Sequence, residues 1–75
     1  MEIYKDIDGD SGVAAYENGE NFIRVKFKDG SIYLYTYAST GQGDIEHMKS
    51  LAIAGDGLNS YINKYVRKAY ETREA

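Results

Sequence analysis

The sequence predicts a small α+β fold, in which a three-stranded antiparallel meander carries two helices packed on one face. The first half of the chain has short apolar and aromatic runs separated by Asn-Gly and Asp-Gly turns. The second half has apolar residues at helical spacing. A chain of 75 residues fits one domain with a thin core, which we expect at 11–73, after an acidic, partly mobile segment at 1–10.

The three strands are expected at 12–16, 22–28 and 31–37. The run FIRVKFK alternates apolar and basic residues, which is typical of a strand with one face in water. The run SIYLYTY is rich in β-branched and aromatic residues, which favour strands.

Two helices are expected at 44–54 and 57–73. Gly55 is a suitable stop for the first, and Asp56 is the expected N-cap of the second. The apolar residues of the second segment fall on one half of a helix surface, which predicts an amphipathic helix packed on the sheet. They are Leu58, Tyr61, Ile62, Tyr65, Val66, Ala69 and Tyr70.

The register of the last hairpin is open between two alternatives. A two-residue Asp-Gly turn places Tyr33 and Tyr35 on the outer face beside the basic side chains, and it sends Ile32 and Leu34 to the core. A three-residue loop with a bulge at Gly30 reverses this, so that the tyrosines face inward. The residues alone slightly favour the first alternative.

The chain resembles the KTSC domain, a small domain found at the C-terminus of some lysyl-tRNA synthetases and as a stand-alone protein. The resemblance covers about residues 11–70, although YASTGQG stands where the family usually has Val-Pro. The matching positions are Ile23, Val25 and Phe27 of the alternating strand, Gly30 of the turn, Tyr33 and Tyr35 of the Tyr-x-Tyr strand, and Tyr61, Ile62, Asn63, Val66 and Tyr70 of the helix.

This resemblance implies a domain without an established activity, for which RNA binding has been suggested from the synthetase context. In the family pattern the position between the two tyrosines is commonly polar, which favours the register with Tyr33 and Tyr35 facing inward. The resemblance thus implies that these tyrosines, together with Asn63 and Tyr70, are structural residues.

The segment DIDGDSGVAAYE has nearly the ligand spacing of a calcium-binding EF-hand loop. Asp6, Asp8, Asp10 and Glu17 occupy its acidic positions, but Ser11 stands where the loop needs glycine. The flanking helices of an EF-hand are also missing from the predicted elements. We therefore expect no metal site and no cofactor, with these acids as weak candidates only.

Catalysis is not expected. The only histidine, His47, has Ser50 three residues further along a predicted helix, where both side chains should face solvent. The chain is also too short to enclose a deep water-free pocket. We therefore expect a non-enzymatic protein without a small-molecule substrate.

Composition bounds the compartment and the partners. The chain has no cysteine, no apolar run of membrane-spanning length and no secretory signal, so a soluble, cytoplasmic protein without membrane contact is expected. The net charge of −3 opposes long-range attraction of a polyanion. Basic side chains nevertheless gather in the second strand and the last helix.

The favoured function is a small interaction module that binds a protein partner or self-associates. In the inward register, Ile32 and Leu34 form an apolar strip on an outer strand with a free edge. The alternative is an RNA or single-stranded nucleic-acid binding domain. The candidate binding residues for either function are Arg24, Lys26, Ile32, Leu34, Lys64, Arg67 and Lys68.

Overall fold

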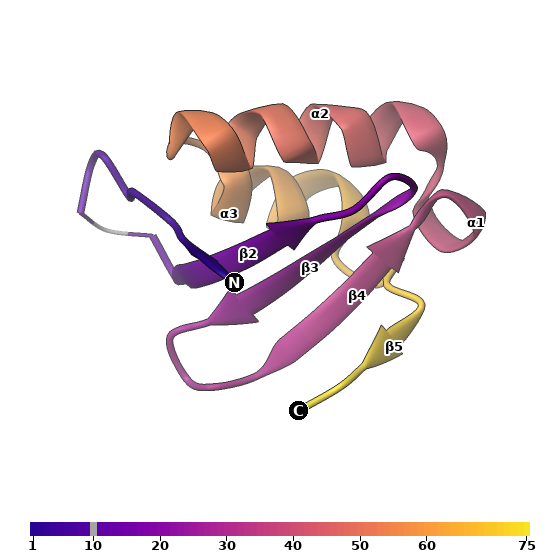
Figure 1. Ribbon diagram of the computed structural model, residues 1–75, viewed down its shortest axis with the longest axis horizontal. Coiled ribbons are helices and arrows are strands. Elements are labelled where there is room, and N and C mark those ends of the chain that lie inside the picture. The colour runs from indigo at the N-terminus through magenta and orange to yellow at the C-terminus, as the bar shows by residue number, and fades with distance from the viewer. Residues whose placement is uncertain (10) are drawn as a thin grey trace.

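A computed structural model describes residues 1–9 and 11–75, and it contains one antiparallel sheet with packed helices (Figure 1). The strands follow one another across the sheet in chain order. They are β1 (Glu2–Ile3), β2 (Val13–Asn18), β3 (Phe22–Phe27), β4 (Ile32–Thr36) and β5 (Thr72–Arg73). The α+β class is confirmed, but the prediction of three strands is wrong. The central meander gains a two-residue strand at each edge, which is too short to leave a pattern in the sequence.

The hairpin between β3 and β4 has the three-residue loop. The Phe27 N–H donates to the Ser31 carbonyl oxygen over 2.8 Å, and Gly30 has a φ of 92°, a conformation that favours glycine. In the resulting register Val25 lies opposite Tyr33, so the two share a face of the sheet. The inward register of the tyrosines is therefore confirmed.

Two helices follow β4. Helix α1 (Tyr37–Thr40) begins with a capping box, in which Thr36 and Ser39 each accept a backbone N–H from the other over 3.1 Å. Helix α2 (Gln42–Ala54) ends at Gly55, whose φ is 74°, so the predicted helix stop is confirmed.

The last helical segment is shorter than the predicted helix at 57–73. Helix α3 (Leu58–Tyr61) continues into a π-helical turn, η1 (Ile62–Val66), and the chain then turns away into β5. The residue that caps α3 is Gly57, with a φ of 81°, so the prediction of Asp56 as N-cap is wrong. The amphipathic pattern could not show that the edge of β4 offers free backbone groups, with which residues after 70 pair instead of extending the helix.

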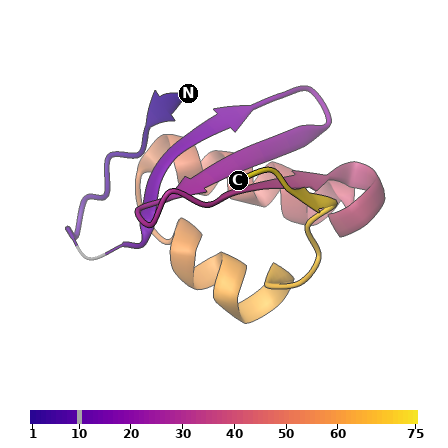
Figure 2. The same cartoon turned by 90° about the horizontal axis from the view of Figure 1, so that it is seen from below.

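The core lies between the helices and one face of the sheet. Figure 2 shows α3 and η1 along one side of the strands. The sheet contributes Val13, Ile23, Val25 and Tyr35 to the core, and the helical segments contribute Ile45, Met48, Ala52, Leu58, Ile62 and Val66. The opposite face of the sheet, here called the outer face, carries Arg24 and Lys26 and is not covered by the described helices.

The first residues of the chain also contribute to this core. Strand β1 pairs with β2, and Tyr4 is only 4% exposed. The Tyr4 hydroxyl accepts the N–H of Leu58 at the start of α3 over 3.3 Å. A buried residue therefore lies inside the segment whose acidic composition predicts mobility. Over residues 1–9 and 11–75, helices long and apolar enough to cross a membrane are absent.

Candidate functional site

Most of the predicted binding residues fall into two groups, and one group gathers in a groove between β4 and the last helical segment. This tyrosine groove has a volume of about 350 Å³. Its lining residues are Phe27, Tyr33, Tyr35, Ile62, Asn63, Arg67, Lys68 and Tyr70. It thus brings together all the aromatic positions of the KTSC resemblance except Tyr61, and two of the predicted basic residues.

The aromatic rings of the groove pack edge to face. The ring centroids of Phe27 and Tyr33 are 5.7 Å apart at an interplanar angle of 82°, and those of Tyr33 and Tyr70 are 4.8 Å apart at 68°. Tyr35 meets Tyr70 at 6.3 Å and 89°. Such pairs hold the rings in fixed orientations, so the wall of the groove is preformed.

The groove is rich in hydrogen-bond donors. Asn63, Arg67 and Lys68 are exposed at its rim, and Tyr70 is 37% exposed. Among the described residues, the side chains of these four have no hydrogen bond or ion pair within the chain, and no carboxylate lines the groove. Cations and hydroxyl groups without internal partners suit an anionic or acceptor-rich ligand.

A further cation lies beside the groove. Arg73 of β5 stands opposite Tyr33 in the sheet, and its guanidinium carbon is 5.6 Å from the centroid of that ring. At the floor of the groove, burial raises the pKa of Tyr35 to about 12, with a smaller contribution from the neighbouring phenols of Tyr33 and Tyr70. Tyr35 therefore stays a neutral hydrogen-bonding group at neutral pH.

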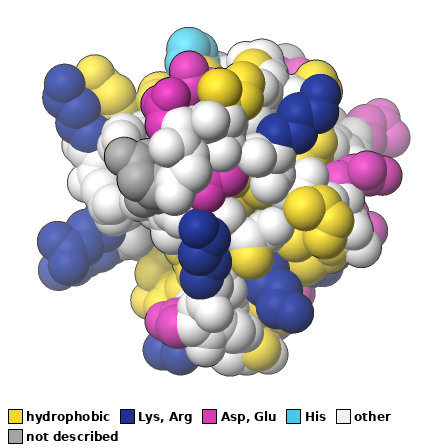
Figure 3. Space-filling model, turned by 90° about the vertical axis from the view of Figure 1, so that its left-hand side faces the viewer, with side chains coloured by type: hydrophobic (Ala, Val, Ile, Leu, Met, Phe, Trp, Pro, Cys, Tyr) yellow, Lys and Arg dark blue, Asp and Glu magenta, His cyan; other side chains and the backbone are white. Residues whose placement is uncertain are grey.

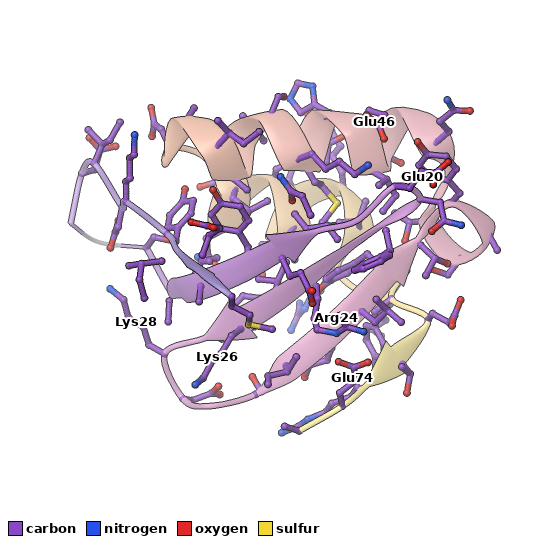
Figure 4. The ribbon with its side chains drawn as sticks, viewed as in Figure 1. Glu20, Arg24, Lys26, Lys28, Glu46 and Glu74 are labelled. Atoms are coloured by element: carbon purple, nitrogen blue, oxygen red, sulfur yellow. The ribbon has the colours of Figure 1, made fainter. Side chains whose placement is uncertain are left out.

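The second group of predicted residues lies on the outer face of the sheet, away from the groove. Arg24 is engaged there: its Nε donates to Glu74 over 2.6 Å, and its Nη1 pairs with Glu17. Glu74, and then Glu17, raises the pKa of Arg24. Figure 4 shows Arg24 beside Glu74 on the face of the sheet turned to the reader, with Lys26 towards the loop end. The side chain of Arg24 is thus engaged in ion pairs, and its pair with Glu74 stabilises β5 against the sheet.

The predicted apolar strip lies on this face, but it is less exposed than expected and its strand has no free edge. Ile32 and Leu34 lie on the outer face, opposite Lys26 and Arg24, but both are only partly exposed. The prediction of a free edge at β4 is wrong, because β5 pairs with it and the N–H of Glu74 donates to the Ile32 carbonyl oxygen over 2.7 Å.

The remaining predicted cation, Lys64, lies near a different ring. Its Nζ is 5.6 Å from the ring centroid of Tyr65, which is 62% exposed. The placement of Tyr65 on the buried half of the helix is therefore wrong.

The acids of the EF-hand-like segment do not converge. Asp6 accepts the Ser11 N–H over 3.1 Å and pairs with Lys28, whereas Glu17 lies on β2 against Arg24. Asp10 lies outside the described residues. Asp6 and Asp8 do line a small pocket of about 170 Å³, but residues 1–9 and 11–75 hold no group of three or more possible metal ligands. Figure 3 shows this end of the molecule, where acidic and basic side chains are interspersed.

The two groups considered for catalysis have structural contacts. The imidazole of His47 stacks on the ring of Tyr61, with centroids 4.7 Å apart. The Ser50 Oγ donates to the backbone carbonyl oxygen of His47 over 2.8 Å.

Sequence reasoning missed two contributors to the groove. Phe27, an apolar position of the alternating strand, packs against the core and also reaches the groove. Arg73 was assigned to the end of a helix, and only its pairing in β5 brings it over Tyr33. Comparison of this chain with protein-family models, curated proteins and solved structures finds no match. The resemblance to the KTSC domain accordingly stays a prediction.

Proposed function

We propose that this protein is a non-enzymatic binding module whose tyrosine groove binds a short segment of single-stranded nucleic acid. The observation that supports the proposal best is the joint placement of aromatic rings and cations around one groove, in which the described residues include no carboxylate and no ion pair to these cations. Single-strand binding proteins use this combination, because bases stack on aromatic rings while cations contact the phosphates.

The size of the groove limits the ligand to a few nucleotides. A volume of about 350 Å³ is at the lower end of the range of ligand sites, about 300–1,000 Å³. The fixed rings of Tyr33 and Tyr70 would meet a base, and Arg67 and Lys68 at the rim would meet its phosphates. Hydrogen-bond readout of a base by Asn63 and Tyr35 would add some sequence preference.

The charge predicts a moderate dependence on salt. The net charge of −3 gives no long-range attraction, so binding relies on Arg67, Lys68 and Arg73 at close range. Two or three phosphate contacts on a single strand give a slope of log K against log salt of roughly −1.4 to −2.1. Affinity should then fall about 7-fold to 18-fold between 50 and 200 mM salt.

The test is fluorescence anisotropy with a labelled thymidylate oligomer and the corresponding RNA. The double variant Arg67→Ala and Lys68→Ala should weaken binding and reduce the salt slope by about 1.4, because it removes two phosphate contacts. Lys26→Ala is the matched control: Lys26 is an exposed lysine on the outer face, so its removal should leave both quantities nearly unchanged. Equal effects of the two changes, or no binding by the wild type, would refute the proposal.

A second candidate function is a contact with a protein partner or a second copy through the outer face of the sheet. Met1 and Ile3 are 52% and 77% exposed there, and Ile3 pairs with Ala15 in the sheet. Together with the partly exposed Ile32 and Leu34, they add apolar surface to this face of the sheet. Sedimentation at micromolar concentration tests self-association: a monomer for both the wild type and Ile3→Glu would remove this candidate for homo-oligomers.

A further inference from the structure

A second aromatic surface lies on the flank of the last helical segment that faces α2. His47 of α2, Tyr61 of α3 and Tyr65 of η1 form a row of three contacting rings, here called the aromatic stack, in which the first pair is stacked and the second is tilted. The centroids of His47 and Tyr61 are 4.7 Å apart at 24°, and those of Tyr61 and Tyr65 are 4.8 Å apart at 46°. Tyr61 is partly buried in the middle, whereas His47 and Tyr65 are exposed at the two ends.

Packing of the core accounts for Tyr61, which lies against it, but not for the exposed ends of the stack. Tyr65 is 62% exposed, although its position in the apolar pattern would bury it in a regular helix. The π-helical turn η1 changes this, because its hydrogen bonds close from i to i+5 and displace the side chains around the axis. Such turns are rare and occur frequently at functional sites.

Basic residues connect the stack with the tyrosine groove. Lys64 lies over the ring of Tyr65, and Arg67 and Lys68 line the groove. The segment 57–70 contains no aspartate or glutamate. The carboxylate of Asp44 does reach the stack, where it accepts the hydroxyl proton of Tyr61, and this hydrogen bond raises the pKa of Tyr61 to about 12.

We propose that the aromatic stack is a second base-stacking site for the same single strand, which runs from the tyrosine groove across Lys64 and Lys68 to Tyr65. This inference rests on the proposed function of the groove. The strand must cross one helix, whose diameter is about 10–12 Å. At about 3.4 Å per stacked nucleotide the crossing takes about three nucleotides, so only strands longer than that can reach both sites.

The test compares thymidylate oligomers of about three and about nine nucleotides by fluorescence anisotropy. Tyr65→Leu should weaken binding of the longer oligomer about 10-fold and leave the shorter one unchanged, since loss of one base–aromatic contact has an effect of this order. Tyr65→Phe retains the ring and should bind like the wild type. Ile53→Ala, which changes an equally exposed apolar residue of α2, is the matched control and should bind like the wild type.

A second readout locates the contact. His47 is the only histidine, so its imidazole gives one identifiable set of proton NMR signals at the end of the stack. The longer oligomer should shift these signals by ring currents more than the shorter one does. If Tyr65→Leu binds the longer oligomer like the wild type and the His47 signals do not move, the second site is refuted. The groove would still stand if removal of Arg67 and Lys68 weakened binding and lowered the salt slope, whereas absence of binding by the wild type would refute both sites.

Discussion

Strand β5 is short, and the change Glu74→Gln should loosen its attachment to β4. Beside the ladder with β4, backbone hydrogen bonds of 2.7 Å run from the N–H of Glu71 to Leu34 and from the N–H of Glu74 to Ile32, and longer ones of 3.4 and 3.5 Å join Ala75 and Ile32. The side chain of Glu74 adds a two-point ion pair with Arg24, at 2.6 Å to Nε and 3.3 Å to Nη2. Loss of this pair should therefore open β5 locally without unfolding the core.

The size of the effect follows from exposure. The side chains of Arg24 and Glu74 are 27% and 32% exposed, so water screens the pair only in part. A two-point pair of this kind is at the upper end of the range for surface ion pairs, about 1 kcal/mol. A change of about 1 kcal/mol alters an equilibrium about 5-fold, so β5 should open about five times more often.

Native-state hydrogen exchange measures this opening directly. In Glu74→Gln, the backbone amides of Glu71 and Glu74 should exchange about 5-fold faster, while core amides such as that of Val25 keep their rates. Glu17→Gln is the matched control, because it removes the other carboxylate partner of Arg24 but leaves Glu74 in place. The difference should shrink in 1 M salt, where the Debye length is only about 3 Å.

Two outcomes would refute this reasoning. Unchanged exchange at Glu71 and Glu74 would show that backbone pairing alone holds β5. An equal effect of Glu17→Gln would show that Arg24 acts through the whole outer face. When β5 opens, Arg73 leaves its place beside the groove, so oligonucleotide affinity in Glu74→Gln should fall only by the fraction of molecules in which β5 is open.

Three further predictions concern titration, the hairpin loop and calcium. Because the pKa of Tyr35 is raised to about 12 in the folded protein, the unfolded chain loses this proton first as the pH rises above 10. The free energy of unfolding should therefore fall between pH 10 and pH 12, by at most about 2.7 kcal/mol from this group. Urea unfolding of Tyr35→Phe should show a smaller fall, and a pH profile identical to that of the wild type would contradict this prediction. Gly30→Ala should lower the free energy of unfolding by about 1–3 kcal/mol because Gly30 has a φ of 92°. Gly43→Ala within α2 should raise the free energy of unfolding by up to about 1 kcal/mol. Shifts of the urea midpoint in the same direction for both variants would contradict the loop geometry. Millimolar calcium should leave the amide signals of Asp6 and Glu17 unmoved, because Lys28 and Arg24 hold these carboxylates apart, and saturable shifts would overturn that conclusion.

Much of the central fold could be predicted from local patterns. Alternation placed β3, turn residues placed the hairpins, and Gly55 marked the end of α2. The inward register of the tyrosines was favoured only through the family resemblance, because the residues alone slightly favoured the other pairing. A preference for apolar Ile32 and Leu34 inside gave way to packing of the larger Tyr33 and Tyr35 rings.

The edges of the fold and the limits of the site could not be predicted in this way. Strands β1 and β5 are two residues long, and each exists only because a neighbouring strand offers its backbone groups. The amphipathic pattern ran on to residue 73, so it concealed both the π-helical turn and the reversal that brings Arg73 over Tyr33. The groove therefore combines residues whose types were visible in the sequence but whose meeting depends on long-range pairing.

The short edge strand β5 also affects whether the protein aggregates at high concentration. Strand β4, with Ile32, Leu34 and three more β-favouring residues, would template cross-chain pairing if its backbone groups were free. Strand β5 occupies those groups with a polar, two-residue segment that is itself too short to recruit another chain. A change as small as Glu74→Gln would then have a cost outside the groove, in the form of slow precipitation or fibril growth on storage.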